Sequence, residues 1–339
     1  MLYVVLLFLA VSLLLYVILA GSDFGAGIVE LFSSKKNQEQ TKKTIYRVMG
    51  PVWEANHIWI IIMVVILWVA FPKFYNILVI YLHLPLTLTL LGITLRGVTF
   101  VFRHYDAYID KSQIIYDWMF RVSSLITPIF LGMTFGATIS GSLIITEDYS
   151  NFSFNQLFVA PWLNIFSILV GLFFAGLCAF LSSILLIGEA NTNNTNIYLR
   201  KSKIATISII ILGFIVLCYG FLNDIKFVSA FINNPYSISL ILLSAILIYP
   251  LLLSIKRAQQ VLSRALAGLQ VVFILTAAIV THYPNLIIAS NNQLSLLDGM
   301  APENTINVLG VSLIIGGCLI IPGLFHLLKS FKMIKILER

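Results

Sequence analysis

The amino-acid sequence predicts an all-α integral membrane protein of about nine transmembrane helices, and three observations support this class. Of the 339 residues, 59% are hydrophobic and only 10% are charged, whereas soluble domains carry about 25% charged residues. The mean hydropathy is +0.97. Nine apolar runs reach the length of about 20 residues that spans a bilayer. Soluble globular, disordered and disulfide-built secreted proteins are therefore excluded, and we expect one transmembrane helical domain over residues 1–339.

The apolar runs lie at residues 2–22, 52–71, 74–101, 117–145, 157–188, 204–224, 237–255, 264–289 and 305–328. The first run lacks a positively charged segment before it and is too long for a signal peptide, so we expect a retained helix. Several runs exceed 25 residues, which favours tilted or extended helices over additional spans. The connections are short and polar, and we expect no soluble domain in them.

Positive charge is distributed unevenly between alternate connections. Of the 21 Lys and Arg residues, 18 lie in the odd-numbered connections or after the last run. Only Lys73 and Lys226 lie in even-numbered connections, and Arg96 lies within a run. Because cytoplasmic loops are enriched in Lys and Arg, we expect the N-terminus outside and the C-terminus in the cytoplasm. The net charge of +7 then reflects topology and does not indicate a nucleic-acid partner.

The sequence predicts no metal site in this chain. Cys178, Cys218 and Cys318 lie in separate apolar runs without metal-ligand spacing. His83 could serve as a haem ligand, since haem ligands in bundles project from facing helices. A lone His in a helix bundle is more often hydrogen-bonded within the protein, and we favour that interpretation for His83.

Three ionisable residues fall at the expected membrane depth: Asp23, Glu54 and Arg96. Such groups cost about 2.5–3.5 kcal/mol each at a helix centre and mark functional sites by default. With the predicted orientation, these residues and His57 lie in the cytoplasmic half of neighbouring helices. Two acids and a His reached from the cytoplasm suit a proton-entry route. The alternative is that Arg96 only neutralises an acid and holds the helices together.

Three motifs carry a resemblance to a known family. Residues 50–59, GPVWEANHIW, followed by Phe71-Pro72, closely resemble the second-helix motif of cytochrome bd-type quinol oxidase subunit II. Residues 21–27, GSDFGAG, resemble the Gly/Asp motif of its first helix. Residues 95–103, LRGVTFVFR, resemble its third-helix motif. The helix count and the length of the chain are similar to that family as well.

This resemblance implies a haem-free subunit in the cell membrane of a prokaryote. In that family, the larger subunit I holds two haems b and one haem d and oxidises quinol. The complex reduces O2 to water and takes the protons from the cytoplasm. Some members contain a small single-helix subunit, or a bound quinone or lipid, and nothing in this sequence decides between those arrangements.

The resemblance also implies roles for individual residues. Glu54 and Asp23 match acidic positions of the family's proton path, and His57 lies beside them in the motif. We expect charge-partner or structural roles for the remaining motif residues: Arg96, Arg103, Trp53, Asn56 and Trp59. Both tryptophans lie near an expected helix end, where aromatic residues form an interfacial belt. Ala20 stands where many relatives carry a second Asp, so a route through both acids would need water or other groups.

The hypothesis is therefore a subunit that stabilises subunit I and helps to deliver cytoplasmic protons to the site of O2 reduction. Two alternatives stay open at this point. One is a purely structural or assembly subunit whose acids are only counter-ions. The other is a proton-coupled secondary transporter, which would show broken helices and paired repeats around a substrate site.

Overall fold

The structure, a computed structural model, describes residues 1–105, 112–187, 195–257 and 259–330. Within these ranges, nine helical segments are long and apolar enough to cross a membrane, which confirms the predicted class. They are formed by α1 (Leu2–Leu15), the π turn η1 (Tyr16–Ala20) and α2 (Gly21–Leu31); α4 (Trp53–Asn56) and α5 (Ile58–Ala70); α7 (His83–Tyr105); α8 (Ser112–Ile139); α9 (Ile165–Ile187); α10 (Thr195–Leu222); α12 (Pro235–Ile246) and α13 (Ile248–Lys256); α14 (Gln260–His282); and α15 (Glu303–Ser330).

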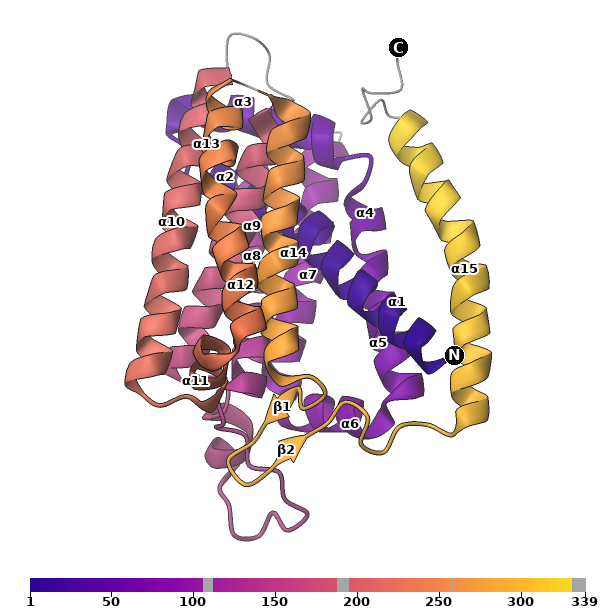
Figure 1. Cartoon of the computed structure of the whole chain (residues 1–339). Helices are drawn as coiled ribbons and strands as arrows, with labels where there is room; N and C mark the ends of the chain where they lie inside the picture. Colours follow the sequence, from indigo (N-terminus) through magenta and orange to yellow (C-terminus); the bar gives the residue numbers. More distant parts are fainter. Residues whose placement is uncertain (106–111, 188–194, 258, 331–339) are drawn as a thin grey trace.

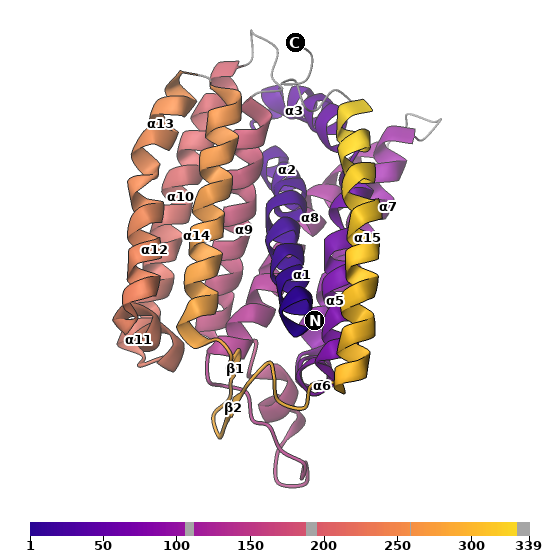
Figure 2. The ribbon, with the colours of Figure 1, turned by 45° about the vertical axis from the view of Figure 1, so that its right-hand side comes forward.

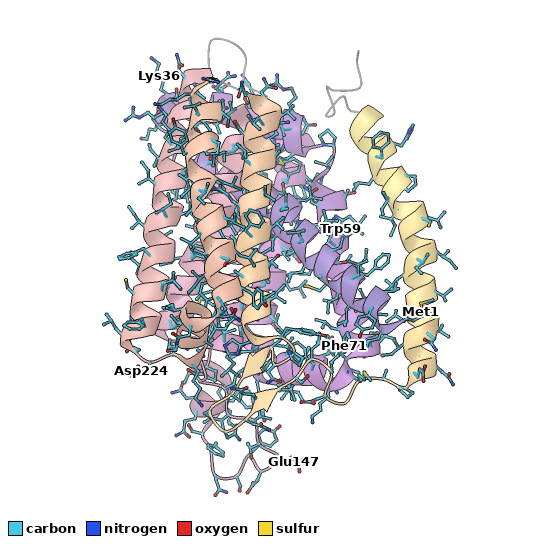
Figure 3. The ribbon with its side chains drawn as sticks, in the orientation of Figure 1. Met1, Lys36, Trp59, Phe71, Glu147 and Asp224 are labelled. Carbon is cyan, nitrogen blue, oxygen red and sulfur yellow. The ribbon has the colours of Figure 1, made fainter. Side chains whose placement is uncertain are left out.

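Shorter elements close the two ends of the bundle. At one end α3 (Lys35–Met49) lies across the helix termini, and Lys36 marks this end in Figure 3. The opposite end carries α6 (Pro72–Tyr81), η2 (Asn155–Val159), α11 (Lys226–Asn233) and the hairpin of β1 (Ile287–Ile288) and β2 (Gln293–Leu294). The hairpin strands are antiparallel, with Ile287 opposite Leu294. We refer below to the α3 end and the hairpin end.

The third predicted run is not one helix. Residues 74–101 include a break at Leu82, which separates α6 from α7, so the membrane-crossing segment begins at His83. The run 264–289 is also shorter as a helix, because α14 ends at His282 and Ile287 already belongs to β1. In both cases the apolar residues beyond the spanning helix are buried in a core cluster at the hairpin end, which contains Phe74 and Ile287. Apolar content alone therefore overestimated the length of these spans.

The amphipathic helix α3 replaces the polar connection expected near residues 33–51. Its buried side chains follow helical spacing: Thr41, Thr44, Ile45, Val48 and Met49. Lys201 of α10 anchors it, since its Nζ donates to Thr41 Oγ1 at 3.1 Å and to Ser33 Oγ at 2.6 Å. Lys42 of this helix forms a half-buried ion pair with Asp117 of α8 at this end.

Close helix packing in the centre depends on small residues. A Cβ added to Gly25 of α2 would collide with the carbonyl oxygen of Cys178 in α9. On α8, a Cβ at Gly132 would meet the backbone of Gly171 at 2.8 Å. These contacts bring α2, α8 and α9 together, whereas α15 stands at the edge of the bundle beside α1 and α5 (Figures 1 and 2).

Candidate functional site: a chain of buried charges

Asp23 and Arg96 form a fully buried ion pair between α2 and α7. Asp23 is 0% exposed and Arg96 is 1% exposed. The guanidinium binds both carboxylate oxygens, with Nη2 donating to Oδ1 at 2.7 Å and Nη1 donating to Oδ2 at 2.5 Å. Nη2 also donates to the Asp23 carbonyl, and Nε donates to Ser124 Oγ on α8 at 3.1 Å. A planar guanidinium with this many partners ties three helices together.

A second cluster of charges lies nearer the α3 end, and its central acid was not singled out in the sequence. Glu30 is 2% exposed, and Arg103 Nη2 donates to both of its carboxylate oxygens at 2.9 and 3.1 Å. Arg121 Nε lies 3.8 Å from Glu30 Oε1. Arg103 Nε is 3.0 Å from Asp117 Oδ1, and Lys42 of α3 donates to the same oxygen at 2.7 Å. The cluster therefore leads from the half-buried Lys42–Asp117 pair inward to Glu30.

The two ion pairs repeat with the same spacing. Each acid precedes its arginine by 73 residues, and the two acids lie seven residues apart, as do the two arginines. Seven residues correspond to about 10 Å along a helix. The ring of Phe120 lies between the two layers, 5.1 Å from the Arg96 guanidinium and 4.3 Å from that of Arg103. The sequence contains this repeat, because Asp23 precedes Arg96 and Glu30 precedes Arg103 by the same 73 residues.

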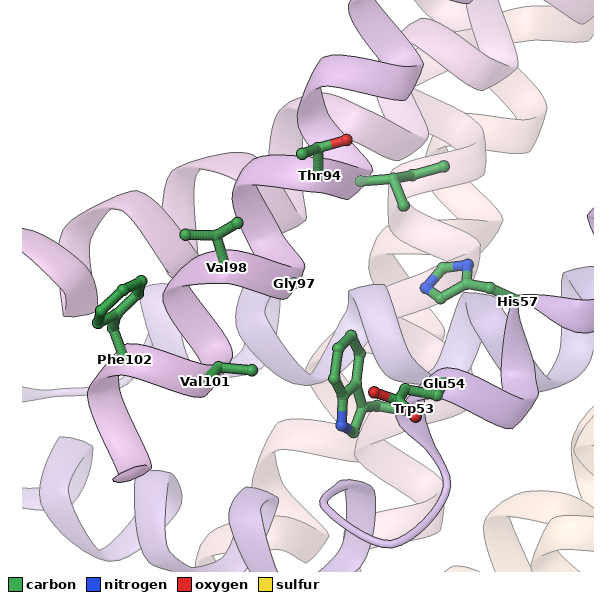
Figure 4. A pocket seen from close by; sticks show the side chains of 9 residues that line it. Trp53, Glu54, His57, Thr94, Gly97, Val98, Val101 and Phe102 are labelled. Atoms are coloured by element: carbon green, nitrogen blue, oxygen red, sulfur yellow. The ribbon is translucent and has the colours of Figure 1, made fainter. Parts of the chain in front are cut away.

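His57 connects the buried pair with an open hollow on the side of the bundle. Its Nε2 lies 3.7 Å from Asp23 Oδ2, and its ring packs edge-on against Phe24 at 5.5 Å. The same residue lines a pocket of about 550 Å³ between α4 and α7, together with Glu54, Trp53, Gly97 and Val101. Figure 4 shows His57 and Glu54 on the α4 side of this hollow, facing α7. His57 is thus the predicted site residue that borders both features.

Glu54 lies on the exposed surface of this chain, in contrast to Asp23. It forms no ion pair with any side chain that the structure describes, and Arg96 binds Asp23 instead. The remaining wall of the pocket is apolar, with Val98 46% and Phe102 47% exposed. An acid on an apolar, laterally exposed surface suits a position at which another membrane subunit is bound.

The other motif residues support this arrangement. Trp53 packs over Gly97, where an added Cβ would lie 3.2 Å from its ring, and lies against Phe100. Asn56 is 6% exposed. Trp59 is also 6% exposed and belongs to the core around Phe24, so its expected place in an interfacial belt is wrong.

Histidines outside the three motifs contact neighbouring backbone and aromatic groups. His83 Nδ1 is 2.8 Å from the Ile80 carbonyl, and its ring contacts Phe158 edge-on. His104 stacks on Tyr46 at 4.1 Å, and His282 stacks on Phe227. Among the described residues, no group of three or more His, Cys, Asp or Glu side chains could hold a metal ion.

In the part of the chain that the structure describes, nine helical segments of membrane-crossing length, with buried acid–arginine pairs between α2 and α7, define a multi-pass membrane protein with charge inside its bundle. Comparison with known sequences specifies the class further. Residues 1–331 match the family model of cytochrome bd terminal oxidase subunit II, and the chain belongs to this family.

Individual relatives agree with this assignment. "Cytochrome bd ubiquinol oxidase subunit 2" of Bacillus subtilis is 30% identical over 160 residues, which cover 47% of this chain and 45% of that protein. "Putative cytochrome bd menaquinol oxidase subunit II" of the same organism is 24% identical over 94% of this chain and 91% of its own length. The structure of bd oxidase from Geobacillus thermodenitrificans superposes with a TM-score of 0.76 at 19% identity, covering 98% of this chain and 99% of that chain. The last comparison shows the shared fold.

Proposed function

We propose that this chain is the haem-free subunit II of a bd-type quinol oxidase, which stabilises a haem-bearing subunit I and carries cytoplasmic protons toward it. The observation that supports this most strongly is a series of buried polar groups arranged in two layers within the described bundle. Lys42 and Asp117 lead to Glu30 and Arg103, and one layer further in Asp23 and Arg96 lead to His57. His57 then borders the Glu54 pocket on the lateral face.

Each group has a defined part in this mechanism. The arginines hold Glu30 and Asp23 in fixed positions and balance their charge inside a low-dielectric interior. His57 Nε2 lies 3.7 Å from Asp23 Oδ2, and the Asp23 carboxylate attracts a proton held on this nitrogen. Glu54 then passes the proton across the lateral face. The haems would supply electron transfer and O2 chemistry in subunit I, whereas this chain positions and moves protons.

We further propose that subunit I covers the pocket between α4 and α7. The pocket combines exposed apolar side chains with one carboxylate that has no partner among the described residues. A contiguous apolar surface of this kind marks an interaction site, and in a bilayer a carboxylate is favoured only where another protein surface or water receives it. Quinol or menaquinol as the electron donor, a small additional subunit and a bound quinone or lipid are not distinguished by these contacts.

A purely structural role is the second candidate, because bidentate buried pairs also lock helices in place. The substitution Glu54→Gln separates the two roles, since it keeps the side-chain volume and removes the titratable proton. In the purified complex we expect full haem content and slower O2 consumption. Glu303→Gln at the start of α15, also exposed, is the matched control. Unchanged turnover of Glu54→Gln would leave only the structural role.

A further inference from the structure

A group of buried polar atoms without partners lies next to the Asp23–Arg96 pair. Tyr16 is 2% exposed and Ser12 is 0% exposed, yet neither hydroxyl has a hydrogen-bond partner among the described residues. The same holds for His57 Nδ1 and Trp59 Nε1. Buried polar groups in proteins are nearly always satisfied by protein, water or an ion, so several such atoms together point to a bound species.

These atoms come from segments that contact one another. Tyr16 and Ser12 are four residues apart and share one face of the first helical segment. The Tyr16 and His57 rings have their centroids 6.0 Å apart, and Tyr16, Phe24 and Trp59 belong to one buried cluster. Helix α1 packs on α5, and η1 touches α4. The residues that carry the unpartnered atoms therefore belong to elements in mutual contact, and the Tyr16 and His57 rings are near neighbours among them.

The local backbone is also unusual at this position. Residues Tyr16–Ala20 form a π turn, in which the N–H of Gly21 bonds to the Tyr16 carbonyl five residues earlier. Such turns inside α-helices are frequent at functional sites. The turn lies immediately before α2, which carries Asp23 and Glu30.

The two nitrogens of His57 face different partners. Nε2 lies on the Asp23 side at 3.7 Å, and Nδ1 is the unpartnered nitrogen. Because both nitrogens of an imidazole can carry a proton, such a ring can take a proton on one side and release one on the other. The centroids of the Tyr16 and Phe24 rings lie 6.0 and 5.5 Å from that of the His57 ring, so a small polar species such as water suits Nδ1.

We propose that Tyr16 and His57 hold one or a few buried water molecules, and that Tyr16 is a positioning residue for proton transfer at His57. The proposal rests on the proton-delivery function above. A proton that arrives at His57 Nε2, where the Asp23 carboxylate favours it, lets Nδ1 release its own proton to the water, so one proton crosses the ring. The neutral imidazole then carries its proton on Nε2, and it returns to the Nδ1-protonated tautomer before the next transfer. The Tyr16 hydroxyl orients the water that receives it.

A cryo-EM map of the intact oxidase complex, at a resolution that shows ordered water, tests the binding site directly. We expect density within hydrogen-bond distance of both Tyr16 Oη and His57 Nδ1, and its loss or displacement in Tyr16→Phe. Absence of such density, or side chains of another subunit bonded to these two atoms, would overturn the proposal. This measurement does not depend on whether the chain conducts protons, and the wild-type map suffices if the variant does not assemble.

Turnover measurements test the positioning role. In Tyr16→Phe we expect normal haem content, O2 consumption lowered about two- to tenfold, the kinetic equivalent of one hydrogen bond, and a larger solvent deuterium isotope effect. Tyr3→Phe is the matched control, because Tyr3 lies on the same helix and is 86% exposed. If Glu54→Gln slows the complex and Tyr16→Phe changes neither quantity, the role of Tyr16 is refuted and the proposed function stands. If the water is present but Glu54→Gln has no effect, the proposed function fails instead.

Discussion

Arg96 is the residue on which the buried charge of the bundle depends most directly. Its guanidinium serves both oxygens and the carbonyl of Asp23, as well as Ser124. Arg96→Ala would leave Asp23 charged and unpaired, a change that costs about 3–5 kcal/mol in buried pairs. We therefore expect poor assembly and reduced haem content, measured by a reduced-minus-oxidised visible spectrum per mole of complex.

Lys43→Ala is the control for Arg96→Ala. Lys43 pairs with Glu39 on the exposed surface of α3, where both side chains are more than two-thirds exposed. Exposed pairs contribute little to stability, so this variant should assemble as the wild type does. A fully assembled, haem-loaded Arg96→Ala complex would contradict the structural importance of the buried pair.

A substitution at Glu30 tests whether protons pass through the cluster of charges near the α3 end. Glu30→Gln retains the volume of the side chain but removes the anion that faces Arg103 and Arg121. If protons pass through this cluster, O2 consumption by the purified complex should fall severalfold at unchanged haem content. Glu39→Gln, an exposed acid on α3, should have no effect. Equal rates for both variants would place proton entry elsewhere.

The sequence allowed part of this site to be predicted, for identifiable reasons. Arg96 stands inside an apolar run and Asp23 directly follows one, where a charge is conspicuous. Glu30 was missed because it lies beyond the first apolar run, close to the polar segment that begins at Ser33. Without its spacing to Arg103, it is indistinguishable from a flanking surface charge. The exposure of Glu54 also could not be predicted, since hydropathy does not say which face of a helix meets the bundle.

At the scale of the elements, helix existence was easier to predict than helix ends. All nine spans appear in the described chain because each needs only about 20 apolar residues. The break at Leu82 and the end of α14 at His282 depend on tertiary packing of apolar residues at the hairpin end. Likewise, α3 is formed from a polar segment that becomes helical against the bundle. Its apolar positions follow helical spacing, but they are too few to stand out from a loop.

Helix contact in the centre of the bundle gives a prediction about Gly25. In Gly25→Ala the new methyl group would collide with the Cys178 carbonyl, which is backbone and cannot rotate away. Overpacking of this kind costs about 1–3 kcal/mol or more, so the apparent Tm of the complex should fall by several degrees. Gly268→Ala in α14 is the control, because nothing lies within 4 Å of its added Cβ. An unchanged Tm for Gly25→Ala would show that α2 and α9 are not held this closely.

At the scale of the whole molecule, the charge distribution predicts that the α3 end faces the cytoplasm. Lys36 marks that end, and Glu147 lies in the loop at the hairpin end (Figure 3). In a background with Cys318 replaced by Ser, Glu147→Cys should react with a membrane-impermeant maleimide in intact cells. Lys36→Cys should react only after permeabilisation. The reverse pattern would invert the orientation and with it the direction of the proposed proton route.

The equal spacing of the two ion pairs has a consequence for how the chain assembles in the membrane. Helices α2 and α7 both run toward the α3 end, so sliding one past the other by two turns, about 10 Å, would bring Asp23 to Arg103 or Glu30 to Arg96. Such a misaligned intermediate keeps one ion pair and strands the other two charges in hydrocarbon. By electrostatics alone, a shifted alignment therefore competes with the native one and has one ion pair fewer. Gly27 of α2 packs closely against Ser124 of α8, and this steric contact favours the native alignment of α2.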